Sequence, residues 1–155
     1  MSRFITFLRQ PLRRKILLFT AIYHLSRAWI IVKKTGFVRE APKLGQKRPG
    51  DWRTPQPVSR DDIRDVRWAI NAVARSFGDR FTCLMIAIAG KAMLRRFAVS
   101  NALVLGANTG SGSEKDEMLA HAWLSAGDMV VFGVEEMEKY APIVSYVDTF
   151  DLPKK

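Results

Sequence analysis

Residues 81–97 read FTCLMIAIAGKAMLRRF, an apolar run that holds the chain's one cysteine, Cys83, near its start. Thr82 is a favourable N-cap residue, which predicts a helix from about Thr82 to Phe97 with Cys83 in its first turn. The interior of the run is apolar nearly all round, so we expect this helix to be central and buried. First-turn N–H groups lack intrahelical partners and the helix dipole favours negative charge, so this position suits a thiolate and an oxyanion.

Two more helices are predicted before this one. The first covers residues 16–32 as an amphipathic helix docked on the domain, because Arg27 at mid-span would cost at least ~2.5 kcal/mol in a bilayer. The second begins at Ser59, a good N-cap, and ends before Gly78. Apolar residues at three- and four-residue spacing form the expected buried stripe of the first helix: Leu18, Ile22, Leu25, Trp29 and Val32.

The rest of the chain predicts a linker and an antiparallel sheet. Residues 36–58 are rich in Pro and Gly and should hold no long element. Short apolar runs predict four strands, at residues 102–106, 120–125, 129–132 and 143–150, with Gly127-Asp128 as a hairpin turn. Helices followed by a meander predict an α+β fold, with a basic N-terminal region over residues 1–58 and a core over residues 59–155.

Positive charge is concentrated near the N-terminus. Residues 1–60 hold 14 Lys or Arg and two acids, whereas the other 95 hold 11 Lys or Arg and 13 acids. An anionic membrane surface, an acidic protein partner or simple solvation explains this better than nucleic acid, since no base-reading motif accompanies the charge. One cysteine excludes an internal disulfide and a cysteine-rich zinc site, and we expect no metal or other cofactor. No secretory cleavage site is evident, so we expect a cytoplasmic protein, with peripheral membrane contact as an open alternative.

A histidine, His121, follows Cys83 by 38 residues in the sequence AHAWL. An antiparallel sheet would lay its strand against the N-terminus of the Cys83 helix. A cysteine in an apolar run and a histidine on a strand are each usually structural. Together, a nucleophile at a helix start and a base on a facing strand are the arrangement of a Cys–His hydrolase. His24 has no such partner in view.

These residues carry a resemblance to a known family. The matching segments are Phe81-Thr82-Cys83-Leu84, Leu103-Val104-Leu105-Gly106, His121-Ala122-Trp123-Leu124 and Gly127-Asp128, with Leu17–Val32, Lys43-Leu44-Gly45 and Val66-Arg67-Trp68-Ala69 upstream. From about residue 12 onward the chain resembles the transglutaminase-like cysteine peptidases of lasso-peptide biosynthesis, the B-type microcin-processing proteins. The resemblance implies a papain-like fold with the cysteine at the start of a central helix packed on an antiparallel sheet.

The resemblance also implies an activity and partners. Cys83 would be the nucleophile, and His121 the general base and later the acid. Such proteins remove the leader from a ribosomally made precursor peptide and free the amine that a separate lactam synthetase, similar to asparagine synthetase, joins to a carboxylate. This chain has no room for a leader-binding domain beside the peptidase core, so we expect a separate leader-binding protein.

The third catalytic residue is left open. Family members often place an Asp about twelve positions after the His, where this chain has Gly133. A regular hairpin around Gly127-Asp128 would set His121 opposite Val134, with Glu135 on the other face. A bulge at Gly133 would shift the register by one and bring Glu135 round. Asp148 on the last strand is the other candidate, and a backbone or water partner for the imidazole is a further alternative.

Two other functions remain open at this stage. One is a non-catalytic scaffold that keeps the fold and binds peptide, which the missing Asp favours. The other is an acyl- or amide-transferring enzyme, because hydrolysis and transfer pass through the same thioester. The segment 108–117, rich in Gly, Ser and charge, is expected to be a mobile loop that borders the cleft.

Overall fold

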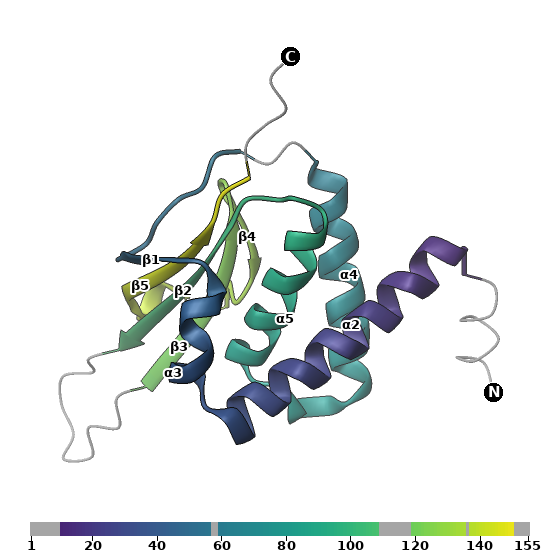
Figure 1. The fold of residues 1–155 in the computed structure, drawn as a ribbon, viewed down its shortest axis with the longest axis horizontal. Helices are drawn as coiled ribbons and strands as arrows, with labels where there is room; N and C mark the ends of the chain where they lie inside the picture. The colour runs from purple at the N-terminus through teal and green to yellow at the C-terminus, as the bar shows by residue number, and fades with distance from the viewer. Residues whose placement is uncertain (1–9, 57–58, 109–118, 136, 151–155) are drawn as a thin grey trace.

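Helices cover one face of an antiparallel sheet (Figure 1). The structure, a computed structural model, describes residues 10–56, 59–108, 119–135 and 137–150. The predicted α+β fold is confirmed, and the segment expected to border the cleft lies almost wholly outside the described residues. The helices are α2 (Leu12–Ile30), α3 (Phe37–Glu40), α4 (Arg60–Ser76) and α5 (Cys83–Arg96). The strands are β1 (Gln46–Pro49), β2 (Asn101–Asn108), β3 (Leu119–Ala126), β4 (Met129–Phe132) and β5 (Ala141–Asp148), in the sheet order β1-β5-β2-β3-β4.

Both long helices after the linker begin where their caps predict. Ser59 Oγ accepts a hydrogen bond from the backbone N–H of Asp62 at 3.2 Å, and α4 starts at the next residue. Thr82 Oγ1 accepts one from the N–H of Met85 at 3.4 Å, so α5 starts at Cys83. An N-cap of this kind is worth about 1 kcal/mol, and here it also fixes where the cysteine lies.

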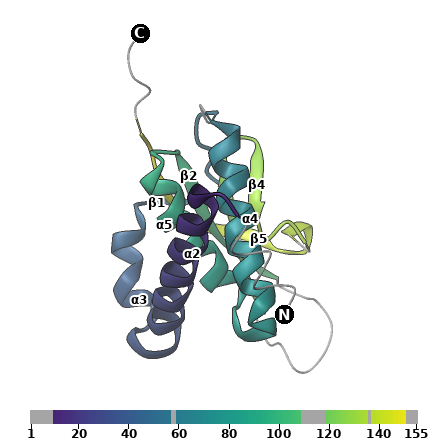
Figure 2. The ribbon, with the colours of Figure 1, turned by 90° about the vertical axis from the view of Figure 1, so that its right-hand side faces the viewer.

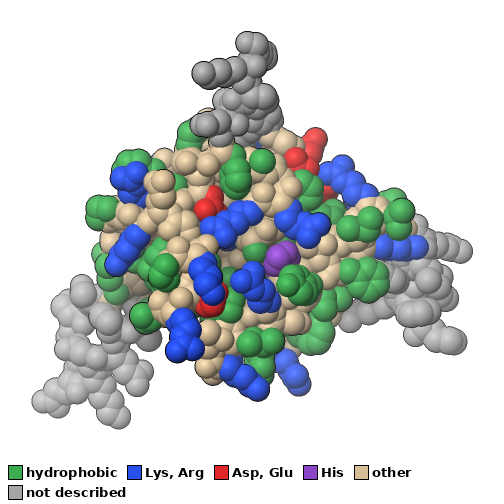
Figure 3. All heavy atoms as spheres, viewed as in Figure 1, with side chains coloured by type: hydrophobic (Ala, Val, Ile, Leu, Met, Phe, Trp, Pro, Cys, Tyr) green, Lys and Arg blue, Asp and Glu red, His purple; other side chains and the backbone are tan. Residues whose placement is uncertain are grey.

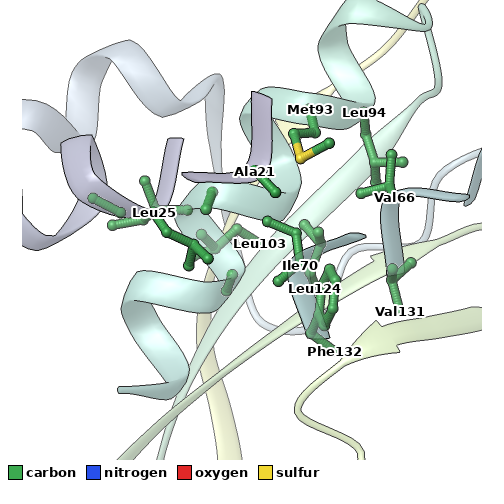
Figure 4. Close-up of a cluster of buried hydrophobic side chains, with 14 of the residues drawn as sticks. Ala21, Leu25, Val66, Ile70, Met93, Leu94, Leu103, Leu124, Val131 and Phe132 are labelled. Carbon is green, nitrogen blue, oxygen red and sulfur yellow. The ribbon is translucent and has the colours of Figure 1, made fainter. Parts of the chain in front are cut away.

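The core lies where α5 meets α2, α4 and the sheet (Figure 4). α5 packs between the two other long helices on one side and β3 on the other, as expected for a helix that is apolar nearly all round. Its labelled neighbours are Ala21 and Leu25 of α2, Val66 and Ile70 of α4, Leu103 of β2, Leu124 of β3, and Val131 and Phe132 of β4.

The predicted buried stripe of α2 is partly wrong. Leu25 is fully buried, but Ile22 and Trp29 are 41% and 40% exposed. The residues that α2 buries are Leu17, Ala21, His24, Leu25 and Ala28. Large apolar residues lie on all sides of α2, so their spacing alone does not predict which side is buried. The chosen face carries two alanines, which let α2 approach α4 and α5 closely.

One strand was not predicted. β1 pairs antiparallel with β5, with Gln46 opposite Val147 and Pro49 opposite Val144. All four residues of β1 are exposed, so the segment shows no alternation of apolar and polar residues. It lies at the sheet edge, where a proline is tolerated.

A buried lysine links α5 to the sheet. The ammonium of Lys91, a residue only 1% exposed, donates to Asn101 Oδ1, to the carbonyl oxygen of Tyr146 and to Asp148 Oδ2, each at 2.9 Å. Arg95 binds the same carboxylate through two nitrogens. Burial lowers the pKa of Lys91 to about 8 although Asp148 opposes the shift. Burial likewise disfavours the Asp148 anion, but the bonds from Arg95 and Lys91 outweigh it, so the pKa of Asp148 is lowered.

His24 on α2 is buried without hydrogen bonds. Both ring nitrogens are inaccessible to water and have no hydrogen-bond partner among the residues that the structure describes, although the ring makes an edge contact with Tyr23. Burial lowers the pKa of His24, and the nearby Arg96 and Arg27 add to the effect. The unpaired nitrogens cost stability, because burial removes their hydrogen bonds to water without replacing them.

We predict that His24→Leu stabilises the protein and flattens the acid side of its stability profile. The unfolded state binds a proton at His24 below about pH 6.5 and the folded state resists it, so His24 lowers stability as pH falls from 7 to 5. Chemical denaturation at pH 7 should give a gain of about 1–2 kcal/mol, growing toward pH 5. The variant His121→Gln, in which His24 is the only histidine, should keep the pH dependence. An unchanged slope in His24→Leu would contradict the assignment.

Candidate active site

Cys83 and His121 line the same cleft, at the open edge of the sheet. The cleft has a volume of about 540 Å³ and lies where α4 and the start of α5 meet the edge strand β4. Its walls are Arg67, Asn71 and Arg75 of α4, Cys83 and Ile86 of α5, His121 of β3, and residues 131–135 at the end of β4 and beyond. The structure therefore brings together the two residues that the sequence separates by 38 positions.

Cys83 is the first residue of α5 and is half-buried. Thr82 caps the N-terminal end of α5. The first-turn amides and the positive end of the helix dipole lie at this end, next to Cys83. N–H groups in a first turn have no carbonyl four residues earlier in the helix to bind. They can therefore stabilise negative charge on the sulfur or on an oxygen next to it.

His121 reaches the cleft from the outer face of the sheet. Its neighbours on β3, Ala122 and Leu124, pack into the helix-covered core, whereas Trp123 belongs to the cluster on the opposite face. Alternation along the strand places His121 on the side of Trp123. The His121 ring lies 5.0 Å from the Tyr140 ring and 6.0 Å from the Trp123 ring, centroid to centroid. These contacts hold the imidazole at the rim where β4 ends.

The backbone carbonyl of Gly133 accepts a hydrogen bond from His121. The distance from Nε2 to that oxygen is 2.9 Å. A carbonyl oxygen cannot donate, so in the neutral ring Nε2 carries the proton and Nδ1 is left as the acceptor. This tautomer leaves one nitrogen free to take a proton from a thiol. Among the described residues no hydrogen bond joins Cys83 to His121, and such contacts often tighten only when substrate binds.

A β-bulge sets this arrangement, two residues earlier than expected. Ser125 pairs with Val130 but Leu124 pairs with Phe132, so Val131 is the extra residue. Of the two alternatives for the hairpin, the regular register is therefore wrong beyond Ser125, and the bulge is present but lies at Val131 and not at Gly133. Gly133 follows with φ of +80°, and a Cβ there would lie 2.6 Å from the carbonyl oxygen of Ala122. Only glycine fits this position without strain, and the turn presents its carbonyl to His121.

The two acidic candidates for a third catalytic residue lie in different parts of the structure, and only Glu135 lines the cleft. Asp148 is bound by Lys91 and Arg95 and pairs with Asn101 at the start of β2, whereas His121 pairs with Gly106 near its end. Glu135 lines the cleft and is exposed, but no described hydrogen bond joins it to His121. Its expected role as a third member is not tested by these contacts, and the described hydrogen bond that orients His121 goes to the Gly133 carbonyl instead.

Sequence reasoning missed two features of the site. Arg67, Asn71 and Arg75 form a row along α4 that faces the cleft, and their four-residue spacing on a predicted helix was the signal. The contact between the Tyr140 and His121 rings could not be read from the sequence, because strand β4 separates the two residues along the chain. Within the described residues, no group of three or more His, Cys, Asp or Glu side chains could hold a metal ion.

Comparison with known families identifies the fold. The family described as the transglutaminase-like superfamily matches residues 25–145, which include both Cys83 and His121. The chain belongs to this superfamily, whose members generally include cysteine peptidases and transferases. Searches of curated proteins and of solved structures give no match.

We predict that the Gly133 carbonyl, and not Glu135, orients His121. Gly133→Ala should displace the carbonyl and lower the rate of Cys83 alkylation by iodoacetamide at neutral pH at least about tenfold, toward that of His121→Gln. Glu135→Gln is the matched control and should react like the wild type. Because the chain has one cysteine, the mass of the intact protein reports the reaction directly. A slow Glu135→Gln variant with normal circular dichroism would instead make Glu135 the third member.

Proposed function

We propose that this protein is a cysteine peptidase that removes the leader from a ribosomally made lasso-peptide precursor. The observation that carries the proposal is the single cleft lined by Cys83 at a helix start and by His121 with Nε2 held by a carbonyl. Membership of the transglutaminase-like superfamily supports chemistry through a thioester. The whole-chain resemblance described above supports the lasso-peptide substrate.

The chemistry follows from the positions of these groups. His121 Nδ1 takes the thiol proton, and the Cys83 sulfur attacks the scissile carbonyl carbon. First-turn amides of α5 stabilise the resulting oxyanion. The imidazolium returns its proton to the leaving nitrogen, which departs as the free amine of the core peptide. A water molecule, deprotonated by Nδ1, then attacks the thioester and releases the leader with a new carboxylate.

Charge in the cleft indicates what the substrate carries. Arg67 and Arg75 stand two helical turns apart on α4, with Asn71 between them, and neither guanidinium forms a described ion pair. Glu135 is the one acidic side chain among the lining residues. A peptide with a carboxylate near the scissile bond would meet charge-assisted hydrogen bonds from this wall.

The proposed partners follow from the same assignment. A separate leader-binding protein would deliver the precursor and raise its local concentration at the cleft. A lactam synthetase would consume the amine that cleavage frees. The chain alone should therefore process its precursor slowly, and addition of the leader-binding partner should raise the rate.

We predict that Cys83→Ala and His121→Ala each reduce leader removal at least about 1,000-fold, since loss of either member of a catalytic unit costs most of the rate. The assay uses purified protein, precursor and leader-binding partner, with cleavage followed by mass spectrometry. Ser76→Ala, an exposed position at the end of α4, is the control and should cleave normally. Undiminished cleavage by Cys83→Ala would refute the proposal.

A non-catalytic peptide-binding scaffold is the second candidate. It is favoured because, among the described residues, the partner of His121 Nε2 is the Gly133 carbonyl and not a carboxylate. The two candidates differ in how Cys83 reacts. A scaffold cysteine should be alkylated at the same rate in the wild type and in His121→Gln, whereas a catalytic thiol should react faster when the imidazole is present.

We predict that Arg67→Gln and Arg75→Gln each raise KM about tenfold for a precursor with an acidic residue near the cleavage site, and leave kcat almost unchanged. Arg64→Gln is the matched control, because Arg64 lies on α4 outside the cleft and pairs with Asp61. Replacing the acidic residue of the precursor by its amide should reproduce the effect in the wild type and abolish the difference between enzymes. An equal KM for all variants would show that this wall does not contact substrate.

A further inference from the structure

The outer face of α2 is apolar, and its large side chains are exposed to solvent. Five large side chains lie 48% to 73% exposed on it: Leu12, Ile16, Phe19, Tyr23 and Ile30. They follow one another at helical spacing, with Ser26 at the step before Ile30, and so form one stripe. α2 lies on the outside of the helical layer, as the side view shows (Figure 2).

This stripe has no role in the core. The residues that α2 buries against α4 and α5 lie on the opposite side of the helix, among them Leu17, Ala21 and Ala28. A helix on the surface of a domain needs one apolar face. A second apolar face of this length, in contact with water, indicates an interaction site.

A hollow beside the stripe extends the apolar surface. Its volume is about 470 Å³, and it lies between the first half of α2 and the C-terminal end of α5. Leu12 and Ile16 belong to both the stripe and the hollow. The other lining residues are Arg13, Leu17, Thr20, Met93, Arg96 and Phe97.

The charged side chains of α2 itself are all basic, although Arg13 pairs with Asp62 and Asp65 of α4 and Arg27 lies 4.0 Å from Glu40. From Leu12 to Thr35 the chain has six Lys or Arg and no Asp or Glu. Arg27 and Lys15 occupy the two flanks of the stripe, and Lys33 and Lys34 are exposed just beyond its end. On the face of the molecule shown in Figure 3, Lys and Arg side chains lie among hydrophobic ones and far outnumber Asp and Glu.

The helix cannot use this surface by crossing a bilayer. Residues Leu12–Thr35 form a helical segment long and apolar enough to span one. Its inner face, however, holds Ala21, Leu25 and Ala28, each 0% exposed in the core. Withdrawal of α2 into a membrane would expose the sides of α4 and α5 that it covers. Contact in the plane of a membrane surface leaves that packing intact.

We propose that the outer face of α2 docks flat on an anionic membrane surface. The apolar stripe enters the boundary between headgroups and acyl chains, and the exposed Lys33 and Lys34 meet lipid phosphates. About 28 Å of helix would lie along the surface, from 19 residues at 1.5 Å each. This inference does not depend on the proposed peptidase activity.

The test is flotation of the full-length protein with lipid vesicles. At low salt the protein should float with vesicles of phosphatidylcholine mixed with phosphatidylglycerol, and not with phosphatidylcholine alone. Lys33→Gln and Lys34→Gln should each weaken binding about fivefold. The double variant Phe19→Ser/Tyr23→Ser should weaken it at least about tenfold. A control double variant, Phe77→Ser/Ile143→Ser, removes two exposed apolar side chains from other parts of the surface and should bind like the wild type.

Several outcomes would overturn the proposal. One is failure of the wild type to float with the mixed vesicles at low salt. Another is equal flotation of Phe19→Ser/Tyr23→Ser, with its fold verified by circular dichroism. Binding that survives high salt and needs detergent would show an inserted helix instead. A dimer in light scattering that this double variant dissociates, without any flotation, would show that a second copy of the chain covers the face.

Discussion

The buried ammonium of Lys91 constrains how α5 lies on the sheet. The ammonium needs hydrogen-bond partners inside the core, and its three partners come from strands β2 and β5. A shift of α5 by one residue would leave a charge without partners in the core, which costs several kcal/mol. Gly90 adds a steric limit, because a Cβ there would lie 2.5 Å from the Phe132 ring. The absence of a Cβ at Gly90 lets the helix approach β4 closely at this point.

This constraint positions Cys83. Cys83 precedes Lys91 by about two helical turns on the same rigid helix. Fixing the register of α5 therefore also fixes the distance of its N-terminus from the edge of the sheet, where His121 lies. Phe132, which packs over Gly90, is followed directly by Gly133, whose carbonyl holds the imidazole. Two adjacent residues at the end of β4 thus act on both: Phe132 limits how α5 packs, and Gly133 orients His121.

Local chemistry made part of this structure predictable. The caps at Ser59 and Thr82 predicted where α4 and α5 begin, and the apolar interior of α5 predicted its central place. Features that depend on tertiary contacts were not predictable in the same way. A bulge at Gly133 was one of the alternatives, but no turn residue marks its actual position at Val131. β1 is exposed throughout, so its sequence has no buried face to show, and it forms a strand by pairing with the edge of β5.

The partial failure on α2 has a physical meaning of its own. Periodicity identifies a buried face when the other face is polar, and here both faces are apolar. The alanines at positions 21 and 28 decide which face turns inward, because small side chains let the helices approach. The larger apolar side chains then stay exposed to water, so folding gains no free energy from burying them. The proposed membrane contact explains why α2 has two apolar faces and only basic side chains: one face packs in the core and the other meets an anionic surface.

The hollow beside α2 and the cleft at Cys83 share no lining residue. Docking through the outer face of α2 therefore leaves the walls of the cleft available to a peptide.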